Sequence, residues 1–324
     1  MSWASREVLI KVVAQAIPTY AMSVFKLPTN LCNAIQSTIN RFWWGYSTEK
    51  KKIHWVNSEV LCTNKNMGGL GFREMEAFNN ALLAKQFWRM AKSDNTLVVS
   101  LLKARYFPDC NIFEAGLGSH PSFTWRSILS ARDLVVKGSR WLIGDGATLD
   151  IWNSGWLSRP FTFAPYTPKP HDGSITKVSD LIDYEQAKWK DGLIRELFLQ
   201  GDADTILGIP LCRSWPRNKL IWHYTSDNYF TVKFAYQLRL SQRLSAQGSS
   251  SNPQTDIWKT IWRLDIPSRI RVFTWRLCQG ALPTHANIAS RIPNHNMCCA
   301  ICGDLCESEP HILLYCPLAI LEWF

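Results

Sequence analysis

The sequence has no long apolar run. No stretch approaches the ~20 apolar residues that a membrane-spanning helix needs. The first residues do not form a secretion signal, because Arg6, Glu7 and Lys11 interrupt the apolar residues and Pro18 interrupts them again. We therefore expect an intracellular protein, in the nucleus or the cytoplasm, that is not secreted and has no membrane partner. In that setting cysteine thiols stay reduced, which favours metal binding over disulfides.

The sequence also lacks the common catalytic patterns. The glycine-rich segment 68–71 is not followed by Gly-Lys-Ser/Thr, so it is no phosphate-binding loop. Asp202 and Asp204 form the one Asp-x-Asp pair, and their polar surroundings predict solvated loop acids. Five histidines have no Ser, Cys or Asp at a recognised catalytic spacing: His54, His120, His171, His223 and His285. These absences indicate a protein that is not an enzyme.

Positive charge is abundant and unevenly placed. The formal net charge of the 324 residues is +10, and the basic residues near the C-terminus all precede a cluster of cysteines. Such a surface suggests a polyanion partner, because neutralising phosphates releases counterions; a solvated basic face without a partner is the alternative. The candidate phosphate contacts are Lys259, Arg263, Arg269, Arg271 and Arg276.

Sixteen tryptophans are several times the usual number, and many of them stand beside cations. Basic residues interleaved with aromatics are typical of single-stranded nucleic-acid binding, by stacking and charge. Most of these tryptophans nevertheless recur at helical spacing. We therefore predict core packing for each of them.

Half of the ten cysteines lie between Cys298 and Cys316. Within this segment Cys299, Cys302, His311 and Cys316 follow the pattern Cys-x2-Cys-x8-His-x4-Cys, the ligand number and spacing of a closed tetrahedral zinc site. A catalytic zinc keeps one position open for water, whereas four protein ligands leave none. The pattern therefore predicts one structural zinc ion.

Other ligand sets, and the absence of a metal, stay open as alternatives. Cys298 or Cys306 could replace one of the thiols, and His295 is a reserve candidate. Buried free cysteines or a disulfide would remove the metal altogether. We prefer the set that ends in Cys316, because Pro317 disfavours helix at the residue before it and so turns the chain there.

Apolar periodicity predicts a mostly helical chain with two short β-hairpins, an α+β fold. One hairpin is predicted over 141–152, around Gly144-Asp145-Gly146, and the other over 220–232. Residues 244–255 read as a flexible linker. Helices are predicted over 5–17, from Thr29 to Gly45, and over 74–92, 96–106, 122–137, 233–243, 256–264 and 268–279.

Several segments resemble the region that follows the polymerase core in plant LINE-type retrotransposon polyproteins. They include Trp3-Ala-Ser-Arg6, Gly68-Gly-Leu-Gly-Phe-Arg73, Trp141 to Trp156 and Val272-Phe-Thr-Trp-Arg276. The Cys299 to Cys316 array resembles that family's reverse-transcriptase zinc-binding domain. The resemblance implies three parts: a helical region over 1–140 that follows an absent polymerase core, a hairpin and proline-rich connector over 141–216, and the zinc-binding domain over 217–324.

The resemblance also implies what this chain does not do. Polymerases of that family use a Tyr-x-Asp-Asp turn to hold two metal ions, and this sequence has no such turn. We therefore expect a non-catalytic, zinc-binding region that binds RNA or DNA, with a polymerase core supplied by another chain as a further partner. The alternative is a zinc-stabilised protein-interaction or structural module that binds no nucleic acid.

Overall fold

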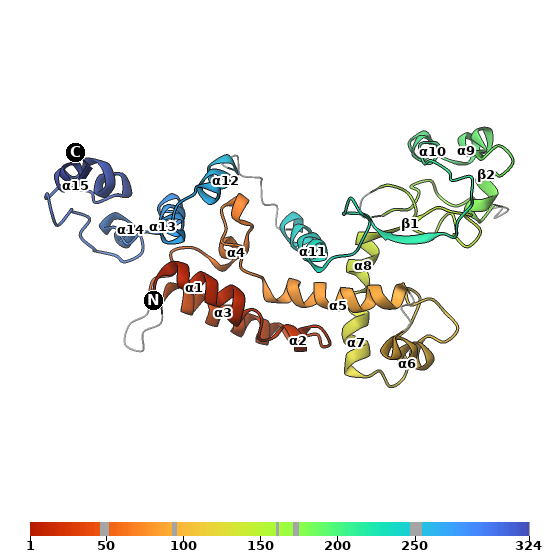
Figure 1. The fold of residues 1–324 in the computed structure, drawn as a ribbon, viewed down its shortest axis with the longest axis horizontal. Helices are drawn as coiled ribbons and strands as arrows, with labels where there is room; N and C mark the ends of the chain where they lie inside the picture. Colours follow the sequence, from red (N-terminus) through yellow and green to blue (C-terminus); the bar gives the residue numbers. More distant parts are fainter. Residues whose placement is uncertain (46–51, 93–95, 160–161, 171–174, 247–254, 324) are drawn as a thin grey trace. The chain divides into compact units, whose positions relative to one another are not determined.

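The computed structural model describes residues 1–45, 52–92, 96–159, 162–170, 175–246 and 255–323 (Figure 1). The chain divides by its contacts into two compact units. Unit 1 combines Met1–Thr19, Pro28–Glu76 and Ser249–Phe324, and unit 2 combines Tyr20–Leu27 and Ala77–Gly248. Unit 1 is therefore assembled from the two ends of the chain. The three-part division at 140/141 and 216/217 concerns sequence modules and stays a prediction.

Unit 1 is helical, and its short N-terminal helices are capped by side chains. Ser2 accepts a hydrogen bond from the Ser5 amide at the start of the first helix, and Asn57 accepts one from the Val60 amide at the start of α4. The elements lying wholly in this unit are α1 Trp3–Leu9, the π-helical turn η1 Ile10–Ala14, α3 Thr29–Trp44, α4 Ser58–Cys62, η2 Lys65–Met67, α12 Thr255–Arg263, α13 Ser268–Cys278, α14 His285–Ala289, the π-helical turn η4 His311–Tyr315 and α15 Pro317–Trp323.

The helix from Thr29 to the glycine at 45 has the predicted bounds. It begins after Pro28, whose fixed φ suits the start of a helix, and ends where Gly45 adopts φ +96°. The helices predicted over 256–264 and 268–279 are confirmed within a residue or two as α12 and α13. Of the predicted linker 244–255, residues 247–254 lie outside the described residues.

Tryptophans from both ends of the chain form the core of unit 1. Trp43 is fully buried and makes edge-to-face contacts with Trp3, at a centroid distance of 5.1 Å, and with Trp275, at 6.3 Å. The Trp275 indole N–H donates a hydrogen bond of 2.8 Å to the Gly68 carbonyl oxygen. Buried aromatics contribute large apolar areas, and the indole N–H finds a partner. The packing of α13 on the N-terminal part of the chain therefore combines burial with a buried hydrogen bond.

Unit 2 holds two apolar cores. One surrounds Trp125 and Trp222, and the other surrounds Trp156 and Ile194. The predicted helix over 122–137 is interrupted near Ala131. Two elements of unit 2 begin in unit 1, namely α2 Thr19–Met22 and α5 Met75–Ala91. The other elements of unit 2 are α6 Leu97–Tyr106, α7 Phe123–Leu129, α8 Arg132–Gly138, β1 Ser139–Leu142, η3 Val178–Leu181, β2 Ile182–Asp183, β3 Lys188–Trp189, α9 Asp191–Leu197, α10 Gln200–Leu207, β4 Lys219–Trp222 and α11 Val232–Ala246.

The two small antiparallel sheets of the fold confirm the predicted class, but their strands pair differently from the prediction. Strand β1 pairs with β4, with Ser139 opposite Trp222, and β2 pairs with β3. The predicted hairpins over 141–152 and 220–232 are therefore wrong as pairings. The reason lies partly in Asn218, whose side-chain oxygen accepts hydrogen bonds from the Gly144 and Gly146 amides and so attaches that turn to the start of β4.

Asp202 and Asp204, predicted to be solvated loop acids, both lie in α10 and differ in exposure. Asp202 lies in α10, is almost fully buried, and pairs with the Arg159 guanidinium at 2.5 Å. It also accepts hydrogen bonds from the amide and hydroxyl of Thr167. Asp204 is exposed and lies 3.6 Å from Arg195. The prediction was wrong for Asp202, because a distant arginine, invisible to local sequence reasoning, compensates its charge.

The prediction that the tryptophans pack in cores is confirmed for the buried ones. Among the residues whose burial the structure describes, five tryptophans are fully buried: Trp43, Trp125, Trp156, Trp222 and Trp275. Across the described residues, no helix combines the length and the apolar character required to cross a membrane.

Candidate zinc site

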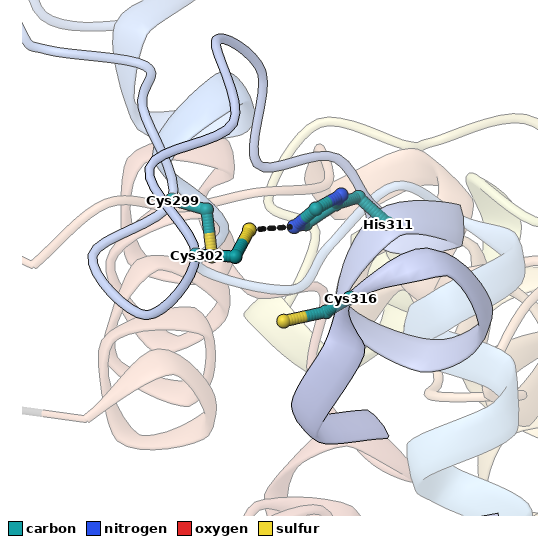
Figure 2. Close-up of side chains that lie close together, drawn as sticks. All are labelled: Cys299, Cys302, His311 and Cys316. Atoms are coloured by element: carbon teal, nitrogen blue, oxygen red, sulfur yellow. Dashed lines mark hydrogen bonds between the residues drawn. The ribbon is translucent and has the colours of Figure 1, made fainter. Parts of the chain in front are cut away.

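The first two candidate ligands lie on a tight turn. The Gly303 amide donates to the Cys299 carbonyl at 2.9 Å, and the Cys299 amide donates to the Asp304 carbonyl at 2.8 Å. Gly303 has φ +76°, a left-handed conformation that glycine adopts without strain. The turn reverses the chain directly after Cys302, so both thiols face the same side (Figure 2).

The other two candidate ligands lie at the ends of a π-helical turn. Residues His311–Tyr315 form this turn, and the Cys316 amide donates to the His311 carbonyl at 2.8 Å. A π-helical turn joins residues five apart, which places the His311 and Cys316 side chains on one side of it. Cys316 itself is extended, with φ −66° and ψ 132°, as predicted for the residue before Pro317.

The four side chains converge from these two segments (Figure 2). Their ligand atoms, three sulfurs and one imidazole nitrogen, all lie within 4.8 Å of one another. The His311 Nε2 atom lies 3.3 Å from the Cys302 sulfur. A tetrahedral zinc with Zn–S bonds of about 2.3 Å needs ligand atoms about 3.8 Å apart. The cluster is therefore already close to the size of a zinc site.

Burial also suits a structural ion. Cys299, His311 and Cys316 are buried, whereas Cys302 is exposed at the edge of the cluster. Four protein ligands leave no open coordination position. A metal held here would cross-link the turn at 299–303 to the helical segment at 311–316.

The pKa values of the Cys299 and Cys302 thiols are shifted in opposite directions. Hydrogen bonds from the backbone amides of Cys302 and Ile301 lower the pKa of Cys299 to about 7. A backbone hydrogen bond at Asp304 acts to lower the pKa of Cys302, but burial and the neighbouring sulfurs of Cys299 and Cys316 leave that pKa raised. Zinc binds thiolates, so a dication would offset the repulsion between these sulfurs.

Asp304 is a component of the site that the sequence analysis did not identify. Its carboxylate lies 3.3 Å from the Nδ1 atom of His311, while the Nε2 atom faces the sulfurs. Metal-binding histidines commonly donate their second ring N–H to a carboxylate, which fixes the tautomer and the ring orientation. The contact depends on the turn at Gly303, so spacing alone gave no signal for it.

The three reserve candidates lie outside the cluster. Among the described residues, the group that could hold a metal ion contains neither Cys298, Cys306 nor His295. Cys298 is half-buried and Cys306 is exposed. No disulfide joins the described cysteines.

The basic residues predicted to contact phosphate lie on α12 and α13. Arg263 and Arg269 are exposed. Lys259 lies 3.3 Å from the Asp256 carboxylate, and the Arg271 guanidinium donates to the Ser268 hydroxyl at 3.2 Å. The first contact is an ion pair near the surface, where such pairs contribute little, and the second is a local hydrogen bond to a neutral hydroxyl.

Arg276 has a different environment from the other four. It is buried, donates to the Ala281 carbonyl at 2.9 Å, and lies over the Trp3 ring with 4.2 Å between its Cζ atom and the ring centroid. Burial and the nearby Arg6 lower its pKa. Its guanidinium is therefore not displayed at the surface as a direct phosphate contact would require.

Residues 230–323 match the family model described as zinc-binding in reverse transcriptase. Over its whole length the chain is 28% identical to an Arabidopsis thaliana relative named ribonuclease H protein, and it spans 52% of that relative's length. A relative named as an uncharacterized mitochondrial protein, also from Arabidopsis thaliana, is 43% identical over 143 residues; the match covers 44% of this chain and 93% of that protein.

The family match and the geometry agree on the metal. The matched domain is a zinc-binding domain, and the cluster of Cys299, Cys302, His311 and Cys316 lies within it and suits one zinc ion. The chain belongs to the plant retrotransposon-derived proteins that carry the zinc-binding domain of reverse transcriptases.

Proposed function

We propose that this chain is a non-catalytic, nucleic-acid-binding region whose C-terminal module is stabilised by one zinc ion bound to Cys299, Cys302, His311 and Cys316. The observation that carries the proposal is the closed four-ligand cluster within 4.8 Å. Zinc at such a site supplies folding free energy, because the unfolded chain has no preformed site.

A scaffolding role for the metal supports the non-catalytic part of the proposal. Catalysis by zinc needs an open position, and the four ligands fill the tetrahedron. Two-metal nucleic-acid chemistry needs clustered carboxylates. Asp202, the buried member of the one Asp-x-Asp pair, is already compensated by Arg159. This chain spans 52% of the relative named ribonuclease H protein, so that name does not define the activity of this chain.

The exposed cations of α12 and α13 support nucleic-acid binding. Among the described residues, no ion pair involves Arg263 or Arg269. The exposed Lys259–Asp256 ion pair and the Arg271–Ser268 hydrogen bond each contribute about 1 kcal/mol, and both cations can therefore exchange these partners for phosphate at little cost. These four residues are the phosphate contacts that we propose.

The test is the salt dependence of binding to poly(U) and poly(dT) oligonucleotides, followed by fluorescence anisotropy. These four phosphate contacts on a single strand should contribute about −3 to the slope of log affinity against log salt. Replacing Arg263 and Arg269 by Gln should reduce the slope by about 1.4. Weak binding that does not depend on salt would contradict nucleic-acid binding.

A second function is favoured by apolar side chains beside the cluster. A hollow of about 280 Å³ is lined by Ile301, Ile312 and Leu318, among other residues, and reaches Cys299 and Cys316. Exposed apolar surface of this kind marks protein contacts. A zinc-stabilised protein-interaction module, with a polymerase core in another chain as one partner, is therefore the alternative that salt-independent behaviour would support.

A further inference from the structure

Two arginines from opposite ends of the chain meet at one tryptophan. The Arg6 Cζ atom lies 4.8 Å from the centroid of the Trp3 ring, and the Arg276 Cζ atom lies 4.2 Å from it. Both guanidinium groups contact the indole as cation–π partners. Arg6 belongs to α1 and Arg276 to α13, and these two helices pack against each other within unit 1.

Lys52 adds a third positive charge, next to Arg6. At Gly45, a Cβ atom would lie 3.3 Å from the Lys52 Nζ atom and 3.4 Å from the Arg6 Nη1 atom. Both cationic nitrogens lie within 3.4 Å of that position and are therefore close to each other. Gly45 has φ +96°, and a side chain at this residue would crowd the two cations.

The three cations have no acidic partner among the residues that the structure describes. Arg6 donates to the Trp43 carbonyl at 2.9 Å and Arg276 donates to the Ala281 carbonyl, but neither acceptor carries a charge. The buried Nε atom of Arg276 has no hydrogen-bond partner. Like charges held this close disfavour one another unless an anion lies between them.

Two lysines in the same unit show how closely spaced positive charges are usually compensated. Lys11 and Lys65 both contact the buried Glu7 carboxylate, at 2.6 and 2.7 Å. Here one acid compensates two lysines, as expected for buried charge. Among the described residues, no acid pairs in this way with Arg6, Lys52 or Arg276.

We infer that Arg6 and Lys52 bind a backbone phosphate of single-stranded nucleic acid beside Trp3. Arg276 adds positive charge from within the core and holds the Trp3 ring. Lys52 is exposed and Arg6 is half-buried, so both can reach a bound strand. The half-buried Trp3 ring already lies against both guanidinium groups, so the contact that we infer is with phosphate and not with a stacked base. This inference rests on the proposed nucleic-acid function and adds a second contact region to it.

The experiment compares two double variants of the full chain that lose the same charge. One is Arg6→Gln with Lys52→Gln, and the control is Lys188→Gln with Arg195→Gln in unit 2, where Arg195 pairs with Asp191. Binding of labelled poly(U) is measured by anisotropy over a salt series. The first variant should lose about 1.4 from the magnitude of the salt slope, at about 0.7 for each lost contact, and the control should keep the wild-type slope.

The outcomes distinguish failure of the Arg6–Lys52 site from failure of the proposed nucleic-acid binding. Equal slopes in the two double variants, with normal salt-dependent binding by the wild type, would overturn the Arg6–Lys52 site alone. Absence of salt-dependent binding by the wild type would overturn the proposed function as well. Arg6 also donates a hydrogen bond to the Trp43 backbone carbonyl, so its replacement could disturb folding. The single variant Lys52→Gln avoids this: the magnitude of its salt slope should fall by about 0.7, and an unchanged slope would contradict the site.

Discussion

At the scale of single residues, the candidate zinc ligands could be predicted and their support could not. The spacing of Cys299, Cys302, His311 and Cys316 is a local property of the sequence, and the structure brings these four side chains together. Asp304 contacts His311 only because the chain reverses at Gly303. The choice between Cys302 and Cys306 also needed the turn, since both are exposed and separated by three residues.

Replacing Cys302 by Ser should abolish stable zinc binding and unfold the chain from about residue 256 onward. Structural zinc contributes about 10–16 kcal/mol of apparent binding free energy in finger peptides, far more than a small module's core supplies. Limited proteolysis under native conditions would show new cleavage sites in that region. Cys306→Ser is the matched control and should keep the wild-type pattern; the reverse result would mean that the ligand set is wrong.

Replacing Asp304 by Asn should weaken zinc binding without abolishing it. Loss of such a carboxylate partner typically costs 10- to 100-fold in metal affinity, and we expect roughly the lower end, because the Asp304 side chain is 56% exposed. Competition with a chromophoric chelator measures the affinity. Glu322→Gln, a change of the same kind at an exposed residue beside the hollow, is the control. Equal affinities of the two variants would show that Asp304 does not support His311.

At the scale of elements, helices followed from the sequence and strand pairing did not. The helix from Thr29 to Trp44 has an apolar face and clear end signals, so local pattern was enough. Strands β1 and β4 are far apart in the sequence, and their pairing depends on Asn218 and on the burial of Trp222. The segment after Gly146 instead pairs with residues near Lys177. Local alternation cannot distinguish these partners.

The packing of α13 gives a prediction at this scale. Replacing Trp275 by Phe removes the buried hydrogen bond to Gly68, whereas Trp43 has a buried indole N–H without a hydrogen-bond partner. Both side chains are fully buried. Trp275→Phe should therefore destabilise the protein by about 1 kcal/mol more than Trp43→Phe, as measured by urea unfolding of the zinc-loaded protein. Equal losses would mean that the hydrogen bond adds nothing beyond apolar burial.

At the scale of the whole molecule, the sequence did not reveal that unit 1 is assembled from both ends of the chain. A linear reading divides the chain at changes of composition, whereas contacts such as Trp43 with Trp275 join residues more than two hundred positions apart. The part of the zinc-binding domain from residue 249 onward therefore packs in one unit with the N-terminal helices, whereas its first residues, 230–248, belong to unit 2. Only tertiary structure shows that a change in one end can affect the other.

Removal of the metal should consequently affect the two units differently. Treatment with EDTA should increase backbone hydrogen exchange in peptides of unit 1, most of all over 285–323, and leave α5 to α8 of unit 2 near their zinc-loaded values. A ligand that binds only the folded state stabilises the unit that contains its site. Mass spectrometry of exchanged peptides measures the effect. A uniform increase over both units would show that the two units unfold together.

The central claim is that one zinc ion organises the C-terminal module, and elemental analysis of the purified, reduced protein tests it most directly. We expect one zinc per chain in the wild type and in Cys306→Ser, and none in Cys302→Ser. A wild-type protein that folds and contains no stoichiometric zinc would contradict the claim.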